Sequence, residues 1–139
     1  MAIARYTVCT ERVRAAGDGI DDPLEALYAG HEEYCRLALE RPGHYRLLFH
    51  GLVQSADADL GRRVAETGLA YFQTCIDACA AAIDAGALRA ADAATLAGAV
   101  WALEHGWCEI ALTGDLGAAV LPGARVALET LLGAAARVG

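Results

Sequence analysis

Apolar residues between positions 59 and 86 recur every three or four residues, in two neighbouring stripes. Such spacing is the period of an α-helix, and charged residues gather on the opposite arc. A helix that is apolar over about half of its circumference packs on two sides, so this segment predicts a long helix at the centre of an all-α bundle. The stripes are Ala65, Leu69, Phe72, Ile76, Ala80 and Ile83, and beside them Val64, Gly68, Tyr71, Cys75, Cys79 and Ala82.

Helix breakers divide the rest of the chain into further helices, and no stretch alternates strictly between apolar and polar residues. We expect Asp22 and Asp92 to be N-caps, with Asp57 or Asp59 doing the same for the long helix. Pro122 is expected to open the last helix. The prediction is a bundle of about six helices, at residues 2–16, 23–40, 44–50, 60–86, 93–113 and 122–137.

Length and charge limit the classes of protein to consider. A chain of 139 residues is expected to be a single domain, spanning residues 1–139. Its formal charge is −7, and its arginines are scattered, so we expect no nucleic-acid binding by this chain alone. With no apolar run of membrane length and no secretory signal pattern, the expected location is the cytoplasm, without membrane contact.

The two helices nearest the C-terminus are too apolar for a small monomer to cover. One of them carries a face of small residues, where another helix could approach closely. Large exposed apolar patches usually mark interfaces. We therefore predict a homodimer in which these two helices and their symmetry mates form a four-helix interface. The expected interface residues are Gly98, Ala102, Gly106, Leu121, Leu128, Leu131, Leu132 and Ala135.

Three polar residues, His31, Glu104 and His105, lie on otherwise apolar stripes. Each histidine is either a core residue with its hydrogen bonds satisfied or one of the few polar groups of an apolar ligand pocket. The second interpretation predicts a cavity between the second, fourth and fifth helices. Helical faces give its expected lining as Tyr28, His31, Cys35, Phe49, Tyr71, Cys75, Cys79, Trp101, His105 and Cys108.

Five cysteines, at positions 9, 35, 75, 79 and 108, leave other chemistries to consider. His31 and Cys35, Cys75 and Cys79, and His105 and Cys108 are pairs at helical spacing, which three helices could bring together as metal ligands. Buried thiols are the plainer interpretation, and a redox sensor would need an exposed thiol of low pKa. We predict no metal, no cofactor and no catalytic residues, because the sequence contains none of the common catalytic motifs.

Two segments resemble the regulatory domains of TetR-type transcriptional regulators. The run Leu39-Glu40-Arg41-Pro42-Gly43-His44-Tyr45-Arg46-Leu47-Leu48-Phe49 resembles the junction after the second helix of these domains. The run Trp101-Ala102-Leu103-Glu104-His105-Gly106, followed by Trp107 and Leu112-Thr113-Gly114, is similar to the Trp-x-x-x-His-Gly signature of their WHG class. The resemblance implies ligand contacts for Trp101 and His105, and a close approach of helices at Gly106.

The resemblance also implies a function. Such domains dimerise and bind a small apolar or weakly polar effector, which alters DNA binding by N-terminal helix-turn-helix units. Here the first helix already resembles the connector that follows such a unit, so DNA binding is expected only through a domain absent from this chain. Two alternatives stay open: a metal- or thiol-based sensor on the same scaffold, and a helical dimerisation module without a ligand.

Overall fold

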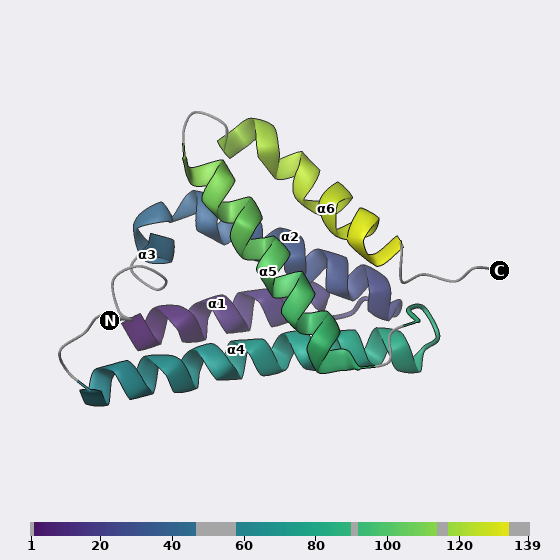
Figure 1. The fold of residues 1–139 in the computed structure, drawn as a ribbon, viewed down its shortest axis with the longest axis horizontal. Helices are drawn as coiled ribbons and strands as arrows, with labels where there is room; N and C mark the ends of the chain where they lie inside the picture. Colours follow the sequence, from purple (N-terminus) through teal and green to yellow (C-terminus); the bar gives the residue numbers. More distant parts are fainter. Residues whose placement is uncertain (1, 47–57, 90–91, 114–116, 134–139) are drawn as a thin grey trace.

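The computed structural model describes residues 2–46, 58–89, 92–113 and 117–133, and these residues form helices and short connections with no strand. The all-α prediction is therefore confirmed. Figure 1 shows the helices in chain order. They are α1 (Ala2–Gly17), α2 (Pro23–Glu40), α3 (Pro42–Arg46), α4 (Ala58–Asp84), α5 (Ala93–Leu112) and α6 (Gly117–Gly133).

Helix α2 is the centre of the bundle, a place that the sequence assigned to α4. It contacts α1, α3, α4, α5 and α6, whereas α4 packs against α1, α2 and α5. Only one of the two predicted stripes of α4 is buried, the one with Tyr71 and Cys75, while Leu69 of the other stripe is 67% exposed. The width of the apolar stripe was a poor guide because the second stripe is only partly covered: Phe72 and Ile76 pack at the edge of the core, while Leu69 faces outward.

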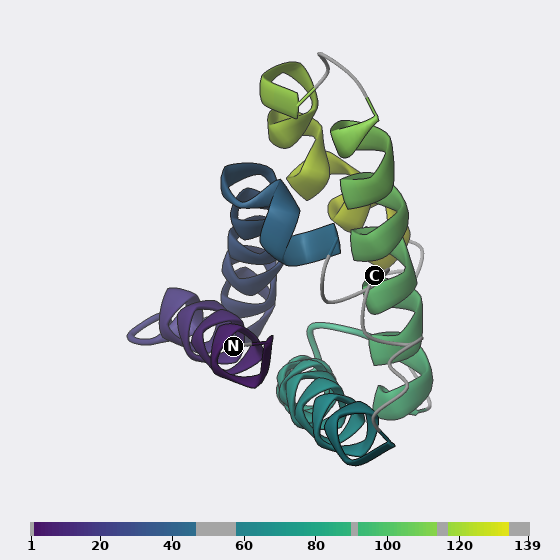
Figure 2. The same cartoon turned by 90° about the vertical axis from the view of Figure 1, so that its left-hand side faces the viewer.

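The layers can be followed in Figure 2, in which α1 and α4 are seen nearly end-on and side by side. Helices α2 and α5 lie above them, and α6 packs across these two on the far side. Helices α1 and α2 approach closely because small residues meet there. A Cβ at Gly17 would lie 3.4 Å from the Cβ of Ala26.

The helix ends follow ordinary capping chemistry, and the predicted N-caps of α2 and α5 are confirmed. The Asp22 carboxylate accepts from the backbone N–H of Leu24 at 2.9 Å, and that of Asp92 accepts from Thr95 N–H at 2.8 Å. Gly86 follows α4 with φ of 72°, a left-handed conformation that glycine adopts without strain. The boundaries of these helices were therefore readable from single residues.

Two predicted helix starts were wrong, those of α3 and α6. Helix α3 begins at Pro42 rather than after Gly43, because proline fits the first position of a helix. Helix α6 begins at Gly117 rather than at Pro122, which lies inside the helix. Pro122 lies in the second turn of α6, where it removes a single backbone hydrogen bond, and residues 117–121 before it still form a helical turn. Asp59 lies in the first turn of α4 and is not its cap, since α4 begins at Ala58. Asp57, the other candidate cap, and the predicted helical residues 47–50 and 134–137 lie outside the described residues.

Candidate functional site

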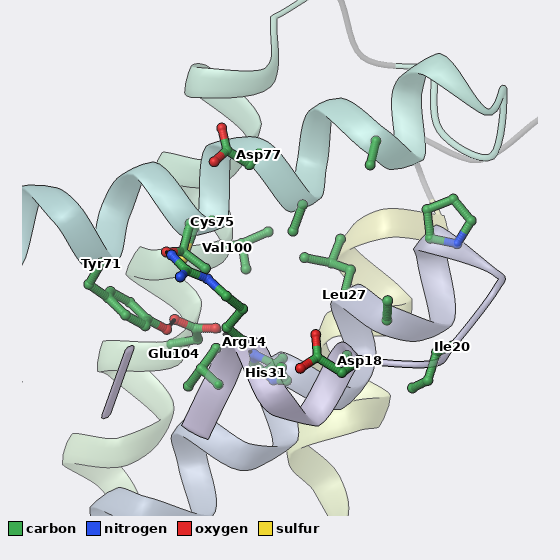
Figure 3. A pocket seen from close by; sticks show the side chains of 18 of the residues that line it. Arg14, Asp18, Ile20, Leu27, His31, Tyr71, Cys75, Asp77, Val100 and Glu104 are labelled. Carbon is green, nitrogen blue, oxygen red and sulfur yellow. Dashed lines mark hydrogen bonds and ion pairs between the residues drawn. The ribbon is translucent and has the colours of Figure 1, made fainter. Parts of the chain in front are cut away.

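A cavity of about 370 Å³ lies between α1, α2, α4 and α5. Its walls are mostly apolar, with Val13 from α1, Leu27 from α2, Ala78 from α4 and Val100 from α5. Figure 3 shows these helices around it. The volume falls in the lower part of the range of about 300–1,000 Å³ that is usual for small-molecule sites.

Helical spacing explains which residues face the cavity. On α4, Tyr71, Thr74, Cys75, Ala78 and Ala81 recur every three or four residues and therefore share one face. On α2 the same spacing brings Pro23, Ala26, Leu27, Gly30 and His31 to the cavity wall. These stripes come from separate helices, so the cavity exists only in the assembled bundle.

A buried polar network forms the inner end of the cavity. His31 and Glu104, both 2% exposed, lie in contact there, and Glu104 Oε1 is 3.3 Å from His31 Nδ1. The Tyr71 hydroxyl donates a hydrogen bond to Glu104 Oε2 at 3.2 Å. His31 Nε2 lies 2.8 Å from the backbone carbonyl oxygen of Ala124 on α6. The network thus joins α2, α4 and α5 through the Glu104 carboxyl group, and reaches α6 through the His31 ring.

Hydrogen-bond chemistry fixes the number of protons in this network. A carbonyl oxygen only accepts, so His31 Nε2 carries a hydrogen toward Ala124. His31 Nδ1 and Glu104 Oε1 then need one further proton between them, on either atom, to form a hydrogen bond. Whichever atom holds it, the pair is neutral overall. A neutral pair is the arrangement that an apolar interior tolerates.

The environment of Glu104 shifts the pKa of its carboxyl group in two opposing ways. Burial raises the pKa of Glu104 above its ordinary value, while the hydrogen bonds and charge of His31 and the hydrogen bond from Tyr71 act in the opposite direction. A carboxyl group with a perturbed pKa at the end of an apolar cavity is typical of a binding site.

The mouth of the cavity is charged. Arg14 extends from α1 toward α4, where its Nη2 is 3.5 Å from the Thr74 hydroxyl. Asp18, Asp21 and Asp77 are exposed and line the same opening. In Figure 3, Arg14 lies on the side of Tyr71 and Glu104, and Asp18 on the side of Leu27. Negative side chains therefore outnumber positive ones at this opening.

A separate aromatic cluster surrounds Trp101 and His105. Their rings are 5.0 Å apart, and Phe72 lies 5.3 Å from Trp101. The Tyr45 hydroxyl is 3.1 Å from His105 Nδ1. Tyr71, whose ring is 6.4 Å from Trp101, belongs to both this cluster and the polar network. Because Trp101 and His105 do not line the described cavity, ligand contact by them stays a prediction.

The structure brings together only some of the predicted ligand residues. His31, Tyr71 and Cys75 line the cavity. Tyr28 instead lies beneath Arg125, whose guanidinium carbon is 4.8 Å from the ring centroid. Phe49 lies outside the described residues. The buried thiols of Cys35, Cys79 and Cys108 are in the hydrophobic core and not on the cavity wall.

The sequence interpretation missed the contribution of α1. Val13 and Arg14 line the cavity, although only the second, fourth and fifth helices were expected there. The spacing of Cys9, Val13 and Ala16 on one helical face was the available signal. Glu104 was noted as a polar residue on an apolar stripe but was left out of the expected lining. Its position beside His31 depends on the packing of α5 against α2, which periodicity alone does not give.

The three cysteine and histidine pairs do not converge on a metal site. Within the described ranges, no three histidine, cysteine or acidic side chains are placed to hold a metal ion. The thiols of Cys35 and Cys108 hydrogen-bond to each other between α2 and α5. Burial raises the pKa of Cys9 to about 12 and that of Cys79 to about 11. Thiols of this kind are inert at neutral pH.

Thiol labelling gives a direct check of this burial. At about pH 7.5, we expect the native protein to react with iodoacetamide at least about 100-fold more slowly than a free cysteine, because burial keeps the reagent from most of the thiols and raises the pKa of Cys9 and Cys79. In denaturant, all five cysteines should react. Intact-mass spectrometry against time measures both rates. Rapid alkylation of one native cysteine would revive the redox-sensor alternative.

The residues expected at the dimer interface divide into two groups. Leu128 and Leu132 are fully buried inside the protomer and have no surface to offer a partner. Ala102 and Gly106 are exposed, Gly98 is half-buried, and Leu131 is 36% exposed. Cβ atoms built at Gly98 and Gly106 would meet nothing within 4 Å. The Leu121 side chain and Ala135 lie outside the described part of the chain.

The comparisons with known proteins point to one family. A model of the family described as "Tetracyclin repressor-like, C-terminal domain" matches residues 27–135, more than three quarters of the chain. No curated protein and no solved structure matches. Among the described helices, none has the length and apolarity to cross a membrane.

Proposed function

The chain belongs to the family of tetracyclin repressor-like C-terminal domains, and from this premise we propose that its cavity binds a small-molecule effector. Domains of this family are parts of transcriptional regulators, which are not enzymes, and they typically dimerise and bind small effectors. The WHG class suggested by Trp101, His105 and Gly106 stays a prediction, as does the effect of a ligand on DNA binding.

The observation that carries the proposal is the combination of an apolar cavity with a buried polar end. Val13, Leu27 and Val100 supply apolar surface for the body of a ligand. Glu104 and His31 supply hydrogen-bonding groups that fix its orientation. Most small-molecule sites have this composition, with few polar groups set in an apolar wall.

The position of α1 suggests how binding affects the bundle. This helix forms one wall of the cavity and contacts α2 and α4. A ligand that contacts α1 and α4 together favours the arrangement of helices that fits it best, which is a shift between existing populations. In a full-length regulator, such a shift would change the positions of attached DNA-binding units.

The outer face of α5 supports the proposal of a homodimer. Ala99, Ala102 and Gly106 are exposed along this face, and Ile110 beyond them is 56% exposed. On the neighbouring α6, Val126 is 60% exposed. Small residues let helices approach closely, and apolar side chains at the edge add buried area on association. We therefore place the dimer contact on these outer faces, without Leu128 and Leu132.

Filling the cavity tests the proposed function. Ala78 lines the cavity from α4, and we expect Ala78→Phe to weaken binding of any effector at least about tenfold, because the new ring occupies ligand volume. Thermal shift against a panel of small apolar and weakly polar compounds identifies the ligands, and calorimetry then measures their dissociation constants.

The matched control is Ala70→Phe, which adds the same ring to an exposed position of the same helix. It should leave binding unchanged. Equal affinities of the wild type and Ala78→Phe for every compound found would show that the ligand lies elsewhere. A panel without any stabilising compound would count against the effector-binding proposal itself.

A further inference from the structure

We propose that the ligand is an apolar primary or secondary amine, bound as its cation, whose ammonium group replaces the proton shared by Glu104 and His31. This inference rests on the proposed function, because it assumes that the cavity is the ligand site. It adds the chemical class of the ligand and the proton that leaves when the ligand binds.

The charges around the cavity favour a cation. Four carboxyl groups line it, and Arg14 is the single basic side chain among its described lining residues that is charged at every relevant pH. The three aspartates Asp18, Asp21 and Asp77 are at the mouth together with Arg14, so the net charge that an approaching cation meets there is negative. The same negative charge would repel an approaching anion.

The proton count of the network selects an amine. Glu104 and His31 share one proton and are neutral together. When a cation enters, that proton can leave for bulk solvent, so that an ionised Glu104 faces the cationic ligand and the interior stays neutral. A bound anion would have Arg14 as its cationic partner, but the Glu104–His31 pair would have to take up a second proton to avoid repelling it.

The distance between the two acceptor atoms favours a ligand with N–H groups. Once the shared proton has left, His31 Nδ1 and Glu104 Oε1 are two acceptors about as far apart as one donor can bridge, at 3.3 Å. An ammonium group with at least two N–H bonds can donate to both atoms. A quaternary ammonium ion cannot donate at all, and an alcohol donates once and carries no charge.

Other titratable groups near Glu104 keep their protons. Burial raises the pKa of Tyr71 and Tyr34 and of the Cys9, Cys75 and Cys79 thiols, and the hydrogen bond with Cys108 together with burial raises that of Cys35. These groups therefore stay neutral near pH 7, and the Glu104–His31 proton is the one available for exchange. The titratable groups that interact electrostatically with Glu104 are Cys9 from α1, His31, Tyr34 and Cys35 from α2, and Tyr71, Cys75 and Cys79 from α4, with Cys108 one turn along α5 and Arg14 at the mouth.

Calorimetry on the unaltered protein tests the proposal. We suggest phenylbutylamine as the probe, titrated near pH 7 in phosphate and in Tris, two buffers with different ionisation enthalpies. The difference in observed heat gives the protons exchanged, and we expect about one proton released for each amine bound. Phenylbutanol should bind at least about tenfold more weakly without proton release, and so should the trimethylammonium analogue.

Variants then locate the proton. Glu104→Gln keeps the shape of the side chain but has no carboxyl group, so it should lose proton release and bind the amine at least about tenfold more weakly. Glu109→Gln removes a carboxylate from the same helix outside the cavity and should behave as the wild type. Circular dichroism checks that both variants fold. If Glu104→Gln does not fold, the proton release measured on the wild type in the two buffers still tests the amine proposal.

The outcomes separate this inference from the proposed function. Equal binding of amine and alcohol without proton release would overturn the amine proposal and leave the cavity as an effector site. Failure of all three probes to bind would also overturn it, while the wider panel and Ala78→Phe still judge the effector site. Proton release that persists in Glu104→Gln would contradict the assignment to the Glu104–His31 pair.

Discussion

Replacing His31 with leucine is expected to lower the free energy of unfolding by about 3–5 kcal/mol, the usual effect of removing one member of a buried charged or proton-sharing pair. The variant leaves Glu104 without its partner in the interior and the Ala124 carbonyl without its donor. Leucine is similar in size, so the loss is chiefly one of hydrogen bonding. Urea unfolding followed by circular dichroism measures the change.

The pH dependence of this loss has a definite sign. In His31→Leu the remaining carboxyl group is buried, and burial raises its pKa in the folded state. The folded state then binds more protons than the unfolded state above about pH 4, the ordinary pKa of glutamate. Stability must therefore fall as the pH rises through this range. The difference between wild type and variant should be smallest near pH 4 and larger at neutral pH.

A double variant separates the pair from its surroundings. We expect His31→Leu with Glu104→Leu to recover much of the lost stability, because no unpaired carboxyl group remains. His44→Leu is the control, since His44 is half-buried on the short helix α3. It should change stability by about 1 kcal/mol or less. A His31→Leu variant as stable as the wild type would show that the pair contributes nothing.

The helical framework was largely predictable because local chemistry determines it. Asp22 and Asp92 satisfy the first N–H groups of their helices through contacts two or three residues away. Such signals lie wholly within a short segment of sequence. The start of α6 was missed for the same reason, since Pro122 is a strong local breaker that tertiary structure here accommodates inside a helix.

The site was less predictable because it depends on how helices meet. Periodicity gave His31, Tyr71 and Cys75 as inward-facing residues, and the structure places all three on the cavity wall. It gave Cys35 and Cys108 equally, yet these thiols lie against each other in the core. A helical wheel shows which side of a helix is buried, but the neighbour on that side follows only from the packing of the whole bundle.

The proposed dimer gives the second large effect, because Ala102→Arg is expected to weaken self-association by at least about 100-fold. Symmetry would bring two arginines together at a closely packed contact, where like charges cost several kcal/mol. Ala102 is exposed in the protomer, so its fold should be unaffected. Sedimentation analysis across a range of protein concentrations measures the dimer dissociation constant, and thermal unfolding checks the fold.

Ala70→Arg is the matched control, with the same substitution at an exposed position of α4. It should leave association unchanged, because α4 lies in the layer opposite α6, away from the proposed contact. An Ala102→Arg protein that remains a dimer would move the interface to another face. Truncating the buried Leu128 to alanine should instead lower stability by about 2–5 kcal/mol. If both results are obtained, the outer face of α5 determines self-association, and the inner face of α6 contributes to the stability of the protomer.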